Sequence, residues 1–132
     1  MPRSIKYLSV EHIITIHNRL PNIKLGGIRA GGRALLESSV SAPCPVFGHE
    51  QYPSLVDKAA VLLHSLVRNH PFNDGNKRTA IHACSVFLSI NGLTLRPVAD
   101  MDIADFVVEV AEGQYTFEEI KEYIVKFYQL NI

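Results

Sequence analysis

Two long apolar segments in the middle of the chain show the spacing expected of helices. Residues 55–69 carry apolar side chains around nearly the whole helical circumference, which is typical of a helix buried on all sides. Residues 77–91 place apolar side chains in one broad stripe and end at an Asn-Gly pair, a common helix stop. We therefore predict two central, buried helices, separated only by a short polar segment.

Shorter amphipathic segments lie on both sides of these two. Residues typical of helix starts precede most of them, and Thr116 with Glu119 forms a capping box. Ser54 with Asp57 forms the same motif at the start of the central segment 55–69. The additional predicted helices cover residues 9–21, 33–40, 100–113 (or 102–113) and 116–130. No segment alternates apolar and polar positions as a half-buried strand does, and no segment is repeated. The sequence thus predicts an all-α, single-domain helical bundle over residues 1–132.

Two connecting segments are rich in glycine or proline. Residues 22–32 contain four glycines together with Lys24 and Arg29, and they show no periodicity. This segment is either a mobile linker or a loop that acts beside the polar segment. Residues 41–53 contain three prolines, and we expect a surface loop there.

Composition excludes several classes of protein. The 13 basic and 13 acidic side chains give a formal net charge of zero, so no strong field attracts nucleic acid or a membrane surface. The chain has neither an apolar stretch of about 18 residues nor the apolar core of a signal peptide near its start. Cys44 and Cys84 are too few for a disulfide framework and suit a reducing compartment. We therefore expect a cytoplasmic protein with no direct nucleic-acid or membrane partner.

The polar segment between the central helices, residues 70–78, contains the elements of a phosphate site. Gly75 permits a tight turn and a close approach to the backbone. Asn76 is a favourable N-cap, so a helix is expected to start there and to present free amides and the positive end of its dipole to an anion. Lys77 and Arg78 add two cations at the same place. These four residues predict that phosphate groups bind at this helix start.

Two further residues of the segment supply other chemistry. Asp74 offers carboxylate oxygens, which Mg²⁺ accepts beside substrate phosphates. His70 is the one group of the segment that exchanges a proton near neutral pH. The alternative is a capped inter-helix loop with a solvated basic face. That alternative accounts for each residue singly but not for the whole set within nine residues.

The other histidines are not expected to take part in this site. His12 and His17 are five residues apart in the first predicted helix, which is not the spacing of a metal-ligand pair, and we interpret both as surface or boundary residues. His64 is interpreted as a core histidine with a hydrogen-bond partner, and His49 as a solvated loop residue. Arg68 comes just before the polar segment and is a further candidate for the phosphate site.

The polar segment resembles the signature of the Fic/Doc family, which this chain carries as His70-x-Phe72-x-Asp74-Gly75-Asn76-Lys77-Arg78. The Fic branch has glycine where Lys77 stands and a second arginine where Ile81 stands. Both differences match the Doc branch, the toxins of death-on-curing toxin–antitoxin modules. The resemblance extends over most of the chain and implies an all-α fold with the signature between two central helices.

The resemblance also implies roles for the signature residues in an ATP- and Mg²⁺-dependent transferase. His70 would be the general base on a target Ser or Thr, Asp74 would hold Mg²⁺, and Phe72 would anchor the loop in the core. The phosphates of ATP would be bound by Gly75, Asn76, Lys77 and Arg78. The loop of the family that corresponds to residues 22–32 helps to dock the target protein.

The implied reaction differs between the two branches. Doc-type proteins transfer the γ-phosphate to elongation factor Tu and arrest translation, whereas Fic-type proteins transfer AMP. Lys77 and Ile81 favour the Doc reaction over AMP transfer. A catalytically inactive binding module is the remaining alternative, and the intact His70, Asp74, Asn76 and Arg78 argue against it.

Regulation is also indicated by what the sequence lacks. Many Fic enzymes carry an inhibitory segment in which Ser or Thr stands four residues before Glu, and no Ser or Thr of this chain has Glu at that spacing. The resemblance therefore implies an external inhibitor, a small Phd-type antitoxin whose disordered C-terminal segment folds on the toxin.

Overall fold

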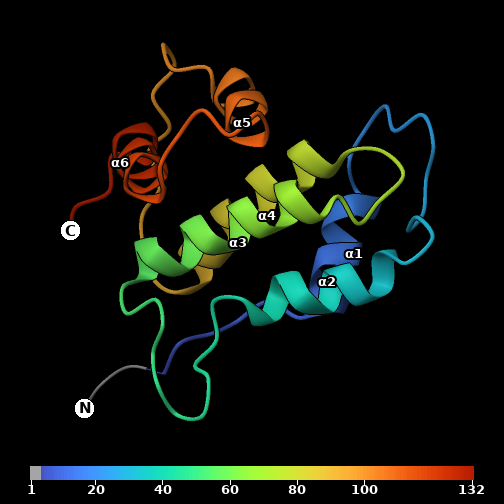
Figure 1. The fold of residues 1–132 in the computed structure, drawn as a ribbon. Helices are drawn as coiled ribbons and strands as arrows, with labels where there is room; N and C mark the ends of the chain where they lie inside the picture. The colour runs from blue at the N-terminus through green and yellow to red at the C-terminus, as the bar shows by residue number, and fades with distance from the viewer. Residues whose placement is uncertain (1–3) are drawn as a thin grey trace.

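The computed structural model describes residues 4–132, and within this range it contains six α-helices and no β-strand (Figure 1). In chain order they are α1 (Val10–Asn18), α2 (Gly32–Ser41), α3 (Leu55–Asn69), α4 (Asn76–Ile90), α5 (Ile103–Ala111) and α6 (Phe117–Tyr128). The all-α fold class is confirmed, and each predicted helix is present within a few residues of its expected bounds. No helix of residues 4–132 has both the length and the apolar character needed to cross a bilayer.

Helix starts follow the local signals in the sequence. At the start of α3, Ser54 Oγ accepts a hydrogen bond from the Asp57 amide at 3.0 Å, and the Asp57 carboxylate accepts one from the Ser54 amide at 3.2 Å. Thr116 and Glu119 form the same reciprocal pair at α6. Asp102 is the N-cap of α5, which decides between the two candidates, Asp100 and Asp102. The capping boxes are therefore confirmed.

The two central helices form the middle of the molecule. α3 contacts α2, α4, α5 and α6, and α1 packs against α4 and α2. Figure 1 shows α3 and α4 side by side, with α1 and α2 on one side of them and α5 and α6 on the other. Side chains such as Leu63 of α3 and Phe87 of α4 are fully buried. The predicted arrangement of two buried helices joined by the polar segment is confirmed.

One charged side chain of α3 is fully buried in the core of the molecule. Lys58 is 1% exposed, and its ammonium is paired with Glu50, donates to the Tyr52 carbonyl at 2.6 Å and lies 5.7 Å from the centre of the Tyr7 ring. A buried charge is tolerated only where such partners compensate for its lost hydration. Lys58 therefore fastens the connection between α2 and α3 to the central helix.

Candidate active site

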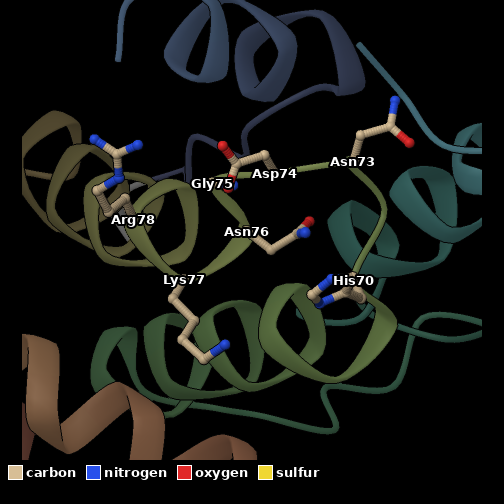
Figure 2. Close-up of a pocket in the computed structure, with 7 residues that line it drawn as sticks. All are labelled: His70, Asn73, Asp74, Gly75, Asn76, Lys77 and Arg78. Atoms are coloured by element: carbon tan, nitrogen blue, oxygen red, sulfur yellow. The ribbon is translucent and has the colours of Figure 1, made fainter. Parts of the chain in front are cut away.

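The loop between α3 and α4, residues 70–75, forms one pocket together with the start of α4 (Figure 2). The pocket has a volume of about 240 Å³ and is lined by His70, Asn73, Asp74, Gly75, Asn76, Lys77 and Arg78. The structure thus brings together all six residues that the sequence selected for catalysis, metal binding and phosphate binding. We refer to residues 70–75 as the α3–α4 loop.

His70 stands at the point where α3 ends. It is the C-cap of α3 in the left-handed conformation (φ 51°, ψ 56°), and its amide donates to the Leu66 carbonyl at 3.2 Å. An L-residue in this conformation is strained by roughly 1–2 kcal/mol, so neighbouring contacts must hold it. The side chain of His70 is exposed and lies at the edge of the pocket, as a group that meets an incoming substrate must.

Arg29 supplies the contacts that hold this turn. Its Nε donates to the His70 carbonyl, its Nη2 donates to the Asn69 carbonyl at 3.0 Å, and its own amide donates to the Pro71 carbonyl at 3.0 Å. A cation at the C-terminal end of a helix also interacts favourably with the helix dipole. The sequence showed Arg29 only as one charge of a glycine-rich segment, because the carbonyls that it binds lie about 40 residues further along.

The glycine-rich segment, residues 22–32, of which Gly32 begins α2, lies along the α3–α4 loop. Ile28 and Phe72 form an isolated antiparallel bridge, and the Asn73 amide donates to the Gly27 carbonyl at 3.1 Å. The Asn73 side chain donates to the Gly26 carbonyl at 3.1 Å. The segment is therefore not a free linker but is hydrogen-bonded along the α3–α4 loop. Its part in docking a target protein remains a prediction.

Asp74 is held in an orientation set by two backbone amides. Lys24 N donates to Oδ2 and Gly75 N donates to Oδ1, each at 2.8 Å. These hydrogen bonds hold the pKa of the Asp74 carboxyl below its usual value, with the bond from Lys24 as the larger cause. Each oxygen of an ionised carboxylate keeps a further lone pair, so both can also reach a metal ion.

The donor set around Asp74 suits Mg²⁺ bound together with phosphate. Among residues 4–132 no group of three His, Cys, Asp or Glu side chains is placed to hold a metal ion by itself. Mg²⁺ is commonly bound by one or two carboxylates plus substrate phosphates, and it needs no cage of protein ligands. One ionised carboxylate beside an anion-binding helix start fits this mode.

The start of α4 differs from the prediction in one respect. Gly75 is the N-cap, in the left-handed conformation (φ 81°), and Asn76 is already the first helical residue. The prediction of Asn76 as N-cap was wrong because its side chain has another task. Asn76 is buried, its Oδ1 accepts from the Phe72 amide at 2.8 Å, and its Nδ2 donates to the Phe72 carbonyl at 2.9 Å. For a phosphate contact the side chain keeps one amide hydrogen.

The backbone at this helix start is open to an anion. The first hydrogen bond of α4 runs from Thr79 N to the Gly75 carbonyl at 2.9 Å. Within residues 4–132 no acceptor of the protein binds the amides of Asn76, Lys77 or Arg78. Three free N–H groups at the positive end of a 15-residue helix form the kind of site at which phosphate groups bind.

Lys77 and Arg78 extend from α4 in different directions (Figure 2). Lys77 forms no salt bridge with any residue in the range 4–132, so its charge is available to a ligand. Arg78 donates from Nη1 to the Pro21 carbonyl at 2.6 Å and from Nη2 to the Asn22 carbonyl at 3.4 Å. Arg78 therefore ties α4 to the segment that follows α1, and its remaining N–H donors are available to a ligand.

His17 was misjudged from the sequence. It is buried, its Nε2 lies 2.7 Å from the Asp74 carbonyl oxygen, and its ring stacks on Phe72 with centroids 3.9 Å apart. The interpretation of His17 as a surface or boundary residue was therefore wrong. No local signal could have corrected it, because its partners are more than 50 residues away in the chain.

Two other basic residues near the site take no part in the pocket. Arg68 is exposed and does not line it. His64 is half-buried, and burial followed by the nearby Arg68 charge lowers its pKa. Its ring has no hydrogen-bond partner within the described residues 4–132, so the partner predicted for it is absent.

Comparison with known proteins agrees with this geometry. A model of the Fic/DOC family matches residues 7–88, more than half of the chain. The chain belongs to the Fic/Doc family. Over 125 residues it is 40% identical to Toxin Doc of Mycolicibacterium smegmatis, covering 92% of this chain and 93% of that protein. Over 128 residues it is 28% identical to Protein kinase doc of Escherichia phage P1, covering 94% and 97% respectively.

Both of these relatives are named Doc. The resemblance to the Doc branch is thereby confirmed, in agreement with Lys77 and Ile81 at the positions where the two branches differ. Because the matches cover almost the full length of both relatives, they include the helices that position the loop as well as the loop itself.

Proposed function

We propose that this chain is the toxin of a type II toxin–antitoxin module and transfers the γ-phosphate of ATP, with Mg²⁺, to a Ser or Thr hydroxyl of a translation factor. The names of its two relatives, one a toxin and the other a protein kinase, support this proposal. The observation that carries it is the convergence in one pocket of an exposed histidine, an ionised carboxylate and the free amide end of a helix. Elongation factor Tu is the expected target.

In this proposal His70 acts as the general base. Its side chain lies at the open edge of the pocket, where a target hydroxyl can approach, and it would take the proton as the oxygen attacks the phosphorus. General-base catalysis of this kind is worth about 10²–10⁴-fold in rate. Arg29 and the left-handed turn fix the backbone from which the imidazole projects.

The remaining pocket residues would bind the transferred phosphoryl group. Asp74 would hold Mg²⁺, which when bound neutralises negative charge on the phosphates. The free amides of α4 would donate hydrogen bonds to phosphate oxygens, and Lys77 and Arg78 would add positive charge. Positioning and charge stabilisation supply most of the catalysis in phosphoryl transfer, and these residues offer both.

The size of the pocket supports recognition of the phosphate end of the nucleotide. Its volume of about 240 Å³ lies below the range of roughly 300–1,000 Å³ that is usual for pockets that enclose a drug-sized ligand. We infer that the pocket takes the phosphates and the metal ion, and that the nucleoside lies on the surface beyond it. AMP transfer, the Fic-type alternative, is disfavoured by Lys77 and by the absence of an arginine at position 81.

A Phd-type antitoxin is the expected partner that restrains this activity. The chain has no inhibitory Ser/Thr–Glu segment of the Fic type, and one relative is named a toxin. An antitoxin that folds on the toxin would supply the missing restraint.

Cell-free translation tests the proposal. We expect the purified chain with ATP and Mg²⁺ to stop protein synthesis, and the His70→Ala variant to have no effect. Adding untreated elongation factor Tu after the toxin has been removed should restore synthesis. Unchanged synthesis in the presence of the purified chain would contradict the proposal, and recovery only with a different factor would correct the target.

A further inference from the structure

His17 joins α1 to the α3–α4 loop at two points. Its Nε2 lies 2.7 Å from the Asp74 carbonyl oxygen, and its ring is parallel to the Phe72 ring within 3°. A carbonyl oxygen only accepts hydrogen bonds, so Nε2 of His17 carries a proton and is the donor. His17 is 3% exposed, which leaves this hydrogen bond little competition from water.

The hydrogen bond from His17 fixes a peptide group that acts on the carboxylate. Within residues 4–132 every peptide bond is trans, and in a planar trans peptide the carbonyl and the following N–H point in opposite directions. Because His17 holds the Asp74 carbonyl, the Gly75 N–H points the other way, where it donates to Asp74 Oδ1 at 2.8 Å. His17 thus sets the direction of one of the two amides that orient Asp74.

The surrounding packing leaves this unit little room to move. Both backbone polar groups of Phe72 are bonded to the Asn76 side chain, and the Phe72 ring is 1% exposed against His17. A Cβ added at Gly75 would lie 2.5 Å from Ile23 Cδ1 and 3.5 Å from His17 Nε2. The start of α4 therefore packs directly against α1 and the segment that follows it. The loop is therefore held from α1, outside the family signature.

We propose that His17 is a positioning residue for the carboxylate that is to hold Mg²⁺. Its N–H and its ring fix the Asp74–Gly75 peptide and Phe72, and it does not line the pocket or meet the substrate. The inference rests on the proposed function for the task of Asp74, whereas the link between His17 and the loop is independent of that function.

Two variants separate the hydrogen bond from the stacking. His17→Phe keeps an aromatic ring against Phe72 and removes the donor. His17→Gln keeps an N–H donor near the position of Nε2 and removes the stacking. His12→Phe is the matched control, because His12 lies on the same helix and, among residues 4–132, its ring bonds only to the Ser9 amide at the helix start.

The first test needs neither ligand nor activity. Hydrogen exchange of the Gly75 amide is measured by NMR on the nucleotide-free protein. Loss of one hydrogen bond is expected to speed exchange about fivefold in His17→Phe, with recovery to within about twofold in His17→Gln and no change in His12→Phe. Unchanged exchange at Gly75 in His17→Phe would overturn the inference, and so would equally accelerated exchange throughout the central helices, which would indicate general loosening.

The second test connects the loop with the metal and is made in the His70→Ala background, so that no transfer occurs. Calorimetry measures the affinity for ATP with and without Mg²⁺. We expect His17→Phe to weaken binding about fivefold with Mg²⁺ and less than twofold without it. An equal loss in both conditions would overturn the positioning role. If even the parent protein fails to bind ATP with Mg²⁺, the proposed function fails, and the exchange measurement still decides whether His17 positions the loop.

Discussion

Side chains both outside and within the signature hold the backbone from which the signature residues act. Arg29 binds the carbonyls at the end of α3, His17 binds the Asp74 carbonyl, and Asn76 binds both polar groups of Phe72. Most of these hydrogen bonds end on backbone atoms, so they fix geometry without adding charge to the pocket. Substituting Arg29 or His17, which do not line the pocket, should impair positioning while the chemical groups of the pocket remain present.

Arg29→Ala should reduce transfer at least tenfold and lower the free energy of unfolding by about 1–2 kcal/mol, because two carbonyls at the end of α3 lose a charged donor. Arg33→Ala is the control. Arg33 is exposed and, within the described residues 4–132, pairs only with the exposed Glu11 and Glu37, and such surface pairs contribute little. Steady-state kinetics and urea denaturation measure both variants. Equal behaviour of the two would contradict the role given to Arg29.

Asp74→Asn should abolish the Mg²⁺ dependence and reduce transfer by roughly 10² or more, because the group that is to hold the metal loses its charge. The fold should persist, since an amide oxygen can still accept from Lys24 N or Gly75 N. Asp105→Asn in α5 makes the same change at an exposed position away from the pocket. Transfer that still depends on Mg²⁺ in Asp74→Asn would show that another residue holds the metal.

At the scale of elements, local sequence signals determine where helices begin. Contacts with residues outside the helix determine which groups form hydrogen bonds at its ends. The capping boxes of α3 and α6 could be predicted because the donor and the acceptor are three residues apart. The start of α4 was predicted at the right place but with the wrong cap. Gly75 takes the left-handed conformation there, and the Asn76 side chain bonds to Phe72 instead of capping. Sequence alone does not choose between these two uses of an asparagine.

The start of α3 should make stability depend on pH through Asp57. Burial raises the pKa of this carboxyl, but hydrogen bonds from Lys121 and Ser54 outweigh it, and the folded-state pKa lies below the usual 3.8. A lowered pKa stabilises the fold above the unfolded-state value, and that stability is lost as pH falls through the folded-state value.

We therefore expect Asp57→Asn to lower the free energy of unfolding by about 1 kcal/mol at pH 7. The difference from the parent should shrink below about pH 4, as the parent carboxyl takes up its proton. Urea denaturation at pH 7 and at a pH below about 4 measures this difference in the free energy of unfolding. Glu118→Gln is the control, because Glu118 pairs with the same Lys121 at 3.2 Å but is exposed. A penalty for Asp57→Asn that is independent of pH would contradict the assignment.

At the scale of the molecule, the pocket forms where distant parts of the chain meet. The α3–α4 loop and the start of α4 supply the residues that line it, the glycine-rich segment lies along the loop, and α1 supports the loop through His17 (Figure 1). α5 and α6 supply no residue to its lining and pack on the central helices. The bundle and the signature could be predicted because both are local patterns in the sequence. The hydrogen bonds of Arg29 and His17 could not, because their partners lie about 40 and more than 50 residues away in the chain.

The most direct measurement is the intact mass of elongation factor Tu after incubation with the purified chain, ATP and Mg²⁺. We predict a gain of one phosphate group with the parent protein and no gain with His70→Ala. The His70→Ala protein must be shown to be folded, for which its circular dichroism and thermal unfolding suffice. A gain of AMP, or a gain of phosphate that persists in folded His70→Ala, would contradict the assignment of the pocket to γ-phosphate transfer with His70 as the base.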